Sequence, residues 1–457
     1  MENEKELTKD FKPYYDNFIK DLFGLLSIDS VLTEFDPKNK RAPFGSGIRE
    51  ALDYTLNLAQ KEGFRVVNDD NYGGFLEWGE GEEVVLILAH LDVVPVSSGV
   101  WTNPPFKPII KDGKIYARGS SDDKGPLMAC YYALKMLKDE GYEPKKKIRF
   151  FFGCDEESGS RCLEHFKEKY PQCDYGFSPD AGFPVIFAEK GISGLQIKGT
   201  FDNSKLVSFT SGSVSNIVPD TAKCVLKDIN LKDEFMRFAL QNNLKAEVNG
   251  DEYTLYGKAA HGSIPEEGIN AALYLGYFLS SFIDTSLTNF IKDYLFFDFN
   301  GEKLGIDCHD DEMGDVSSNA GVFRTEGNAF SIVINMRYPR NFDFNEKMIG
   351  LKELVESLGL KFSVLSNSRY HYVQKNSILI RALLKSYKKW TTGLKVNTEP
   401  VSIGGGTYAR DFENCVGFGA EFSDEEDTMH MPDENKQVDR LVLSSFIYKD
   451  AIKNLCD

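Results

Sequence analysis

The first third of the chain alternates between helical spacing of apolar residues and short apolar runs. Residues 47–63 carry apolar side chains three or four positions apart, which predicts a helix, and residues 126–141 repeat this pattern. Residues 84–89 and 148–152 are apolar at nearly every position over the length of a strand. Because such runs are typical of strands covered on both faces, they predict parallel strands in an α/β sheet.

The middle third has a different pattern, in which short alternating strands are separated by polar turns and two helices. The strands are expected at 192–201, 205–210, 222–225 and 251–257, and the helices near 270–282 and 346–358. After about residue 376 the first pattern returns, with a helix from 378, a glycine-rich turn and a C-terminal helix over 437–455.

This change of pattern predicts one α/β domain that is split in sequence by an insertion. Residues 1–190 and 374–457 would form the split domain, a mixed and largely parallel sheet covered by helices. Residues 191–373 would form an inserted α+β domain.

The composition indicates a globular protein that avoids polyanions. Apolar residues make up 42% of the chain, and the net charge of −17 disfavours nucleic acid or an anionic membrane as a partner. No basic-then-apolar leader and no run of about 20 apolar residues is visible, so we expect a cytoplasmic protein. The eight cysteines form no Cys-x-x-Cys pair, which favours reduced, buried thiols over a thiolate zinc site.

Acids and a histidine follow the predicted strands directly, where ligands bind in open α/β sheets. Carboxylate and imidazole without thiolate suit zinc, manganese or cobalt, and desolvated carboxylates need a positive partner. The pattern therefore predicts a metal site, in which a pair of ions would require a bridging carboxylate. The four candidate places are His90-x-Asp92, Asp122-Asp123, Asp155-Glu156-Glu157 and Asp180.

Each of these places also has a structural interpretation when taken alone. A His-x-Asp after a strand is often a satisfied hydrogen-bonded pair, and adjacent acids on a loop are often only solvated charge. Gly404 to Gly406 lacks the spacing of a nucleotide-binding loop. His165, His309 and His371 match no motif and are interpreted as surface or packing residues.

Longer stretches around these residues resemble the signature of the two-metal aminoacylase and carboxypeptidase G superfamily of peptidases, and within it the PepV-type dipeptidases. Small departures are Cys154, where the family more often has Thr, and Ala188, where it often has Gly. The resemblance spans nearly the whole chain, in order, at residues 89–95, 101–106, 116–126, 155–159, 178–180, 188–191, 260–263, 404–410 and 429–434.

The resemblance implies two divalent metal ions, zinc or manganese, in the split domain. His90 and Asp180 would hold one ion, Glu157 and His430 would hold the other, and Asp122 would bridge them. The split domain would then be the catalytic domain.

The resemblance also implies the remaining catalytic roles. Asp92 would orient the His90 ring, and Glu156 would be the general base on a metal-bridged water. His261, in the insertion, would stabilise the developing oxyanion. The candidates for holding the substrate's carboxylate are Asn216, Arg337, Gly404, Gly405 and Gly406.

The function implied is a metal-dependent dipeptidase that hydrolyses short unblocked peptides, with the insertion as a lid. The long, doubled insertion of PepV-type enzymes implies a monomer. The alternatives are an aminoacylase-like amidohydrolase of N-acyl amino acids and, from another class, a non-catalytic metal-binding protein of the same fold. A two-metal nuclease is disfavoured by the charge of −17.

Overall fold

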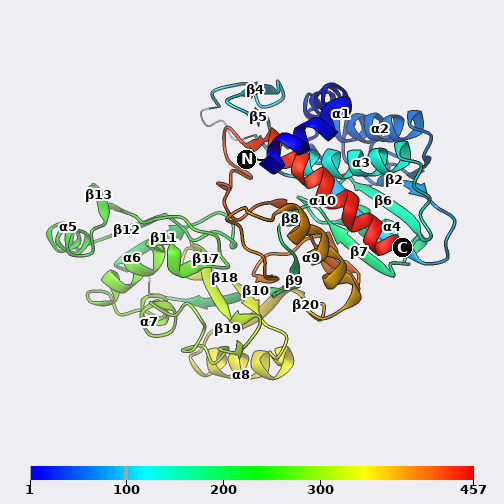
Figure 1. The fold of residues 1–457 in the computed structure, drawn as a ribbon. Helices are drawn as coiled ribbons and strands as arrows, with labels where there is room; N and C mark the ends of the chain where they lie inside the picture. The colour runs from blue at the N-terminus through cyan, green and yellow to red at the C-terminus, as the bar shows by residue number, and fades with distance from the viewer. Residues whose placement is uncertain (1, 97–100, 203) are drawn as a thin grey trace. The chain divides into compact units, whose positions relative to one another are not determined.

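The computed structural model describes residues 2–96, 101–202 and 204–457, and the chain divides into two compact units (Figure 1). The first unit comprises Met1–Ala188, Tyr372–Val401 and Gly406–Asp457. The second unit comprises Glu189–His371 and Ser402–Gly405. The chain therefore passes between the units four times.

The first unit is built on a sheet whose centre is parallel. Its strand order is β1-β2-β6-β3-β7-β22-β9, in which β3 lies parallel to both β6 and β7. Every residue of β3 is buried, as its apolar run predicts. The strands of this sheet include β1 (Arg65–Asp69), β2 (Gly73–Trp78), β3 (Val84–His90), β6 (Lys147–Gly153), β7 (Tyr175–Ser178), β9 (Ile186–Glu189) and β22 (Cys415–Gly417). Two smaller sheets are formed by β4 (Ile109–Lys111), β5 (Lys114–Tyr116) and β24 (Asn435–Gln437), and by β8 (Ala181–Gly182) and β23 (Ala420–Glu421).

Helices pack on this sheet and on one another. The C-terminal helix α10 packs against α3, α9 and β3, while α2 and α4 contact β2. The helices that the sequence predicts in this unit are confirmed to within a few residues. They are α2 (Ser46–Lys61), α3 (Lys124–Asp139), α9 (Ile378–Trp390) and α10 (Val438–Cys456). The short helix α4 (Arg161–Lys169) and the 3₁₀ turn η3 (Tyr408–Asp411) were not predicted.

One long helix of this unit, α1 (Glu2–Leu26), was not predicted. Its buried side chains Phe11, Phe18, Leu22 and Leu25 recur at helical spacing and pack in the core of the first unit. Acidic and polar residues between them dilute the pattern, and Pro13 lies inside the helix.

The second unit is an antiparallel sheet of two halves, with the order β13-β14-β12-β11-β17-β18-β10-β19 among the described residues. The halves join between β11 and β17, where Ser211 and Phe323 form the paired position. The strands are β10 (Gly191–Thr200), β11 (Leu206–Ser211), β12 (Thr221–Leu226), β13 (Lys245–Asn249), β14 (Glu252–Tyr256), β15 (His309–Asp310), β16 (Gly314–Asp315), β17 (Ser317–Glu326), β18 (Ala329–Tyr338) and β19 (Lys361–Ser368).

The helices of the second unit contribute to one apolar core with this sheet. Asn270 caps α6 by accepting hydrogen bonds from the backbone N–H groups of Ala272 and Leu273, and its amide donates to Ala320 O. The helices are α5 (Lys232–Gln241), α6 (Ala271–Ser280), α7 (Ser286–Phe290) and α8 (Phe344–Ser357), with the turns η1 (Pro265–Glu267) and η2 (Ile291–Leu295).

Three short strands carry the chain across the division between the units: β9 (Ile186–Glu189), β20 (His371–Tyr372) and β21 (Val401–Ile403). The glycine-rich turn is divided in the same way, because Gly404 and Gly405 belong to the second unit and Gly406 to the first. Within the described residues, no helix combines the length and the apolar character that crossing a membrane requires.

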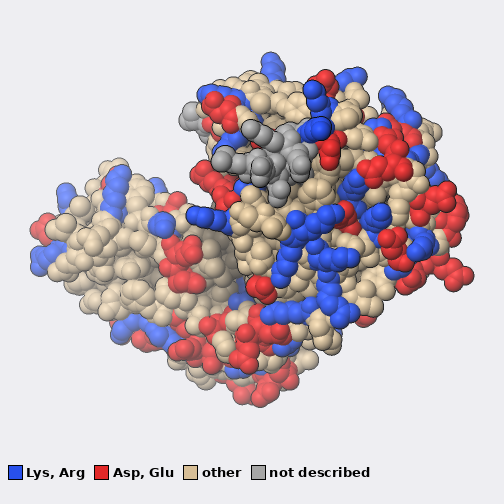
Figure 2. Space-filling view, viewed as in Figure 1, with Lys and Arg blue, Asp and Glu red and all other residues tan. Residues whose placement is uncertain are grey.

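Basic side chains gather on α9 despite the acidic composition (Figure 2). Arg381, Lys385, Lys388 and Lys389 are exposed on this helix. Two of them have acidic partners, since Lys388 Nζ lies 3.2 Å from Glu399 Oε1 and Lys389 pairs with Asp450. The patch is therefore partly neutralised within the first unit.

Candidate metal centre

The predicted acids and histidine meet because they follow adjacent parallel strands of the first unit. His90 ends β3 and lies in register with Gly153, the last residue of β6. Glu156 and Glu157 follow β6, and Asp180 follows β7 on the other side of β3. The carboxyl ends of neighbouring parallel strands lie at one edge of a sheet, so these side chains converge there.

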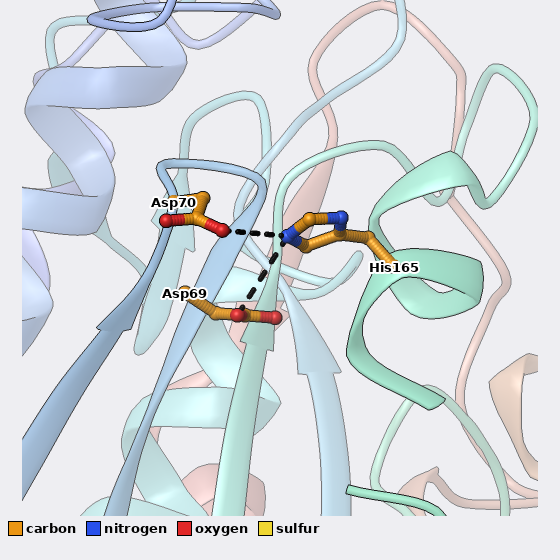
Figure 3. A group of neighbouring side chains, drawn as sticks. All are labelled: Asp69, Asp70 and His165. Atoms are coloured by element: carbon orange, nitrogen blue, oxygen red, sulfur yellow. Dashed lines mark hydrogen bonds and ion pairs between the residues drawn. The ribbon is translucent and has the colours of Figure 1, made fainter. Parts of the chain in front are cut away.

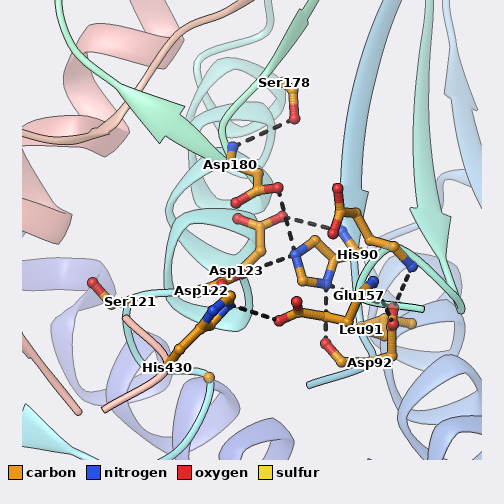
Figure 4. Close-up of polar contacts among 12 residues, drawn as sticks. His90, Leu91, Asp92, Ser121, Asp122, Asp123, Glu157, Ser178, Asp180 and His430 are labelled. Atoms are coloured by element: carbon orange, nitrogen blue, oxygen red, sulfur yellow. Dashed lines mark hydrogen bonds and ion pairs between the residues drawn. The ribbon is translucent and has the colours of Figure 1, made fainter. Parts of the chain in front are cut away.

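Two further segments complete the cluster (Figure 4). Asp122 comes from the loop before α3, and its two carboxylate oxygens face different imidazoles. Asp122 Oδ1 lies 2.9 Å from His90 Nε2, and Asp122 Oδ2 lies 2.8 Å from His430 Nε2. Asp180 Oδ2 lies 3.5 Å from His90 Nε2, and Glu157 Oε1 lies 3.3 Å from His430 Nε2. The candidate ligands therefore form two groups that share Asp122. The first group is His90, Asp122 and Asp180, and the second is Asp122, Glu157 and His430.

The donor atoms of the first group fit a cation. His90 Nδ1 lies 2.9 Å from the main-chain oxygen of Asp92, which can only accept, so Nδ1 carries a proton. The neutral ring then presents the lone pair of Nε2 to the carboxylates of Asp122 and Asp180. His90 Nε2 is buried, and no described residue donates a hydrogen bond to it. Lone pairs that face one another in a buried place require positive charge between them.

The electrostatics at Glu157, His430 and His90 favour added positive charge. Burial, with the charge of Asp122, raises the pKa of Glu157 to about 7. Hydrogen bonds to Asp122 and Glu157 raise the pKa of His430 to about 11. Burial opposes charge on His90, but the carboxylates of Asp180 and Asp122 outweigh it and raise the pKa of His90 well above its ordinary value. Divalent cations would supply this positive charge without protonating the ligands.

Asp92 supports the cluster in a way that differs in detail from the expectation. Its main-chain oxygen accepts from the His90 ring, while its carboxylate oxygen Oδ1 lies farther from His90 Nδ1, at 3.6 Å. The carboxylate instead accepts hydrogen bonds from the backbone N–H groups of Glu156 and Glu157, both at 3.0 Å. Asp92 thus orients the ring through its backbone and fixes the turn after β6 through its side chain.

Glu156 stands beside this cluster without belonging to either group of candidate ligands among the described residues. Burial, followed by the negative charge of Asp180, raises the pKa of Glu156 well above its ordinary value. A carboxylate with a raised pKa can accept a proton at neutral pH, as a general base must. Its neighbour Asp155 is held elsewhere, with Oδ1 and Oδ2 each 2.6 Å from the Arg161 guanidinium.

Two buried acids next to the cluster were assigned no role from the sequence. Asp123 follows a cis Asp122–Asp123 peptide bond and accepts a hydrogen bond from His90 N at 3.0 Å. Glu434 accepts from Arg118 and from three backbone N–H groups of the loop that carries Asp122. Both lie inside stretches that carry the family resemblance, and only their burial marks them as structural partners of the ligands.

The predicted substrate-contacting residues of the insertion lie in the second unit. His261 Nδ1 lies 2.6 Å from Ser263 Oγ, and the backbone oxygen of Asn216 accepts from Gly262 N at 2.6 Å. Asn216 and His261 are exposed, whereas Arg337 is buried.

Arg337 joins two segments of the second unit. Its Nε donates to Asn335 Oδ1 at 2.8 Å, and its Nη1 donates to Gly404 O at 2.9 Å. Gly404 itself approaches Ser263 so closely that a Cβ at this position would lie 2.4 Å from Ser263 Cβ. Arg337, Gly404 and the loop of His261 are therefore packed together, although the roles assigned to them stay predictions.

A third group of candidate ligands, Asp69, Asp70 and His165, lies at the end of β1 (Figure 3). Asp69, Asp70 and His165 face one another there. Lys169 Nζ lies 2.6 Å from Asp69 Oδ1, 2.6 Å from Asp70 Oδ2 and 2.9 Å from His165 Nε2. The Lys169 ammonium group already binds the carboxylate and imidazole atoms that a metal ion would use. The cluster of Asp69, Asp70 and His165 therefore does not require a metal ion.

Comparison with known proteins establishes the family of this chain. The sequence profile of peptidase family M20/M25/M40 matches residues 86–454, which is most of the chain. The chain belongs to this peptidase family. The resemblance stated from the sequence motifs is thereby confirmed.

Individual relatives match this M20 peptidase over nearly the whole length of both chains. A Staphylococcus saprophyticus protein, whose own dipeptidase name is provisional, is 40% identical over 474 residues, covering 97% of this chain and 98% of the relative. Human carnosine dipeptidase 1 has the same fold, with a TM-score of 0.60 and 13% identity over 99% of this chain and 98% of the relative. A Bacillus subtilis protein solved as a dinuclear metal-binding M20 peptidase has a TM-score of 0.50 and 12% identity, covering 97% and 98%.

Metal addition should stabilise the chelator-stripped protein. At about 100 times the dissociation constant, Zn²⁺ or Mn²⁺ is expected to add about 2.7 kcal/mol to the free energy of unfolding. His430→Ala should reduce this gain, because it removes one donor of the cluster. The matched control is His165→Ala, since Lys169 already neutralises that group. Thermal unfolding with and without metal measures the gain, and an equal gain in His430→Ala and wild type would contradict the assignment.

Proposed function

We propose that this M20 peptidase is a two-metal dipeptidase that hydrolyses the peptide bond of short unblocked peptides. The observation that carries the proposal is Asp122, whose two oxygens each face a different histidine. A carboxylate in that position can bridge two ions, and paired ions serve the hydrolysis of amides. Family membership and the relatives named as dipeptidases support the reaction class.

We assign the metal ligands as two sets with one shared member. His90 and Asp180 would hold one ion, Glu157 and His430 the other, and Asp122 both. Imidazole and carboxylate donors suit zinc or manganese. When bound, the ions would lower the pKa of water and polarise the carbonyl of the scissile bond.

The chain's own residues then move the proton and hold the peptide. Glu156 takes a proton from the attacking water and passes it to the leaving amine, which its raised pKa permits. His261 donates a hydrogen bond to the oxyanion that develops on the carbonyl. We assign recognition of the substrate carboxylate to Asn216, Arg337, Gly404, Gly405 and Gly406, with the second unit acting as a lid.

We also infer a cytoplasmic monomer that does not bind nucleic acid. All eight cysteines are free, and six of them are buried, as suits a reducing compartment. The second unit already contains two joined halves of sheet, so one chain can supply what a dimeric relative would take from its partner. The net charge of −17 would repel a polyanion.

A substrate panel tests the reaction class. Chelator-stripped protein, with and without Zn²⁺ or Mn²⁺, is assayed on unblocked dipeptides, tripeptides and N-acetyl amino acids. We expect metal-restored cleavage of dipeptides. Faster cleavage of N-acetyl amino acids would indicate an aminoacylase-like enzyme, and inactivity of fully metallated protein on the whole panel would indicate a non-catalytic protein of this fold.

Glu156→Ala should remove turnover while leaving metal binding intact, because Glu156 belongs to neither group of candidate ligands. We expect kcat to fall by at least about 10²-fold, the typical contribution of a general base. The control is Glu164→Ala, an exposed acid on α4. Near-normal kcat in Glu156→Ala would refute the base assignment, and metal content is measured alongside.

His261→Ala should lower kcat by about 10²- to 10³-fold with a smaller effect on KM, as expected for the loss of one oxyanion donor. His309→Ala is the matched control, because His309 is an exposed histidine of the same unit. Steady-state kinetics on the best dipeptide separates kcat from KM. An effect on KM alone would place His261 in substrate binding instead.

A further inference from the structure

Glu434 is a fully buried carboxylate whose oxygens are occupied by the loop that carries Asp122. Its Oε2 accepts from Arg118 Nη1 at 2.6 Å. Its Oε1 accepts from the backbone N–H of Ser121 at 2.9 Å and of Asp122 at 3.2 Å, and Gly119 N lies 3.1 Å from both oxygens. One side chain therefore satisfies three donors within four successive residues, which would otherwise be buried without partners.

This loop sets the position of the carboxylate that the two groups of candidate ligands share. Asp122 donates its own backbone N–H to Glu434, while its side chain faces His90 at 2.9 Å and His430 at 2.8 Å. A shift of the loop would move both oxygens of Asp122 together. The geometry of both groups of candidate ligands thus depends on the hydrogen bonds that Glu434 accepts from this loop.

Glu434 holds a second ligand segment as well, since it lies four residues after His430. The His430 side chain is 55% exposed, so packing alone does not hold it. The adjacent residue Asp433 also fixes this segment, because its carboxylate accepts from Thr102 N and Oγ1 at 2.8 and 2.7 Å. The main-chain oxygen of Glu434 also accepts from Ala117 N at 3.1 Å.

Glu434 is not placed to be a ligand itself. Its oxygens are directed at Arg118 and at backbone N–H groups, and it belongs to neither group of candidate ligands in the described chain. We propose that Glu434 is a positioning residue that ties the Asp122 loop to the His430 segment and thereby sets the metal affinity of the centre. This inference rests on the proposed two-metal function.

Glu434→Gln tests the inference because it keeps the size of the side chain and every proposed ligand. The amide NH₂ of glutamine donates, so it cannot accept from the N–H groups that one carboxylate oxygen now serves. Glu77→Gln is the matched control in the same unit. Glu77 is a buried acid that accepts from Arg149 Nε at 3.0 Å and Nη2 at 2.6 Å, and it contacts none of the proposed ligands.

The measurement is the affinity of chelator-stripped protein for Zn²⁺, by competition with a chromophoric chelator, together with the absorption spectrum of the Co²⁺-loaded protein. We expect Glu434→Gln to weaken Zn²⁺ binding by about 10- to 100-fold, as for other residues that orient metal ligands, and to change the Co²⁺ spectrum. Glu77→Gln should retain wild-type Zn²⁺ affinity even if its stability falls. Wild-type affinity in folded Glu434→Gln would overturn the proposal.

If Glu434→Gln does not fold, a second variant, Glu434→Asp, tests the positioning role. Glu434→Asp keeps the charge that Arg118 requires but is one methylene too short to reach the whole loop, so Zn²⁺ affinity should again fall. If it binds Zn²⁺ as wild type does, the positioning role is wrong. If the wild-type protein itself binds no Zn²⁺, the two-metal function and this role fail together. If it binds Zn²⁺ but cleaves no peptide, only the dipeptidase assignment fails.

Discussion

The sharing of Asp122 between two imidazoles is the interaction on which the candidate centre depends. His90 reaches one carboxylate oxygen from the end of a buried strand, and His430 reaches the other from a loop near the C-terminus. Bringing these segments together desolvates several acids at once, which is unfavourable unless positive charge accompanies them. The parallel arrangement of β6, β3 and β7 is what makes the convergence possible, because it places their carboxyl ends at one edge.

Buried acids outside the ligand groups hold this arrangement in place. Asp92 accepts from the turn that carries Glu157, and Glu434 accepts from the loop that carries Asp122. In both cases a side-chain carboxylate satisfies backbone donors instead of facing the centre. The ligands are therefore positioned by loops whose hydrogen bonds end on neighbouring acids, as is common around metal ligands in proteins.

The periodicity of the sequence predicted most elements but missed α1. Its buried residues Phe11 and Phe18 are a full seven positions apart, and the polar residues between them weaken the helical pattern. The helix is stabilised by packing against α3 and α10, contacts that a local pattern does not reveal. The contribution of Asp92 was predicted only in part for a similar reason, because its backbone and side chain contact different partners.

The alternation of strands and helices, the candidate ligands and the family could all be predicted from the amino-acid sequence. These follow from local spacing and from motifs, which survive without knowledge of distant contacts. Three contacts could be seen only in the folded protein: Asp122 lies between two histidines, Lys169 neutralises the third acidic group, and Glu434 accepts hydrogen bonds from the Asp122 loop. Each of these depends on side chains far apart in the chain, and no local pattern specifies which buried charge will find which partner.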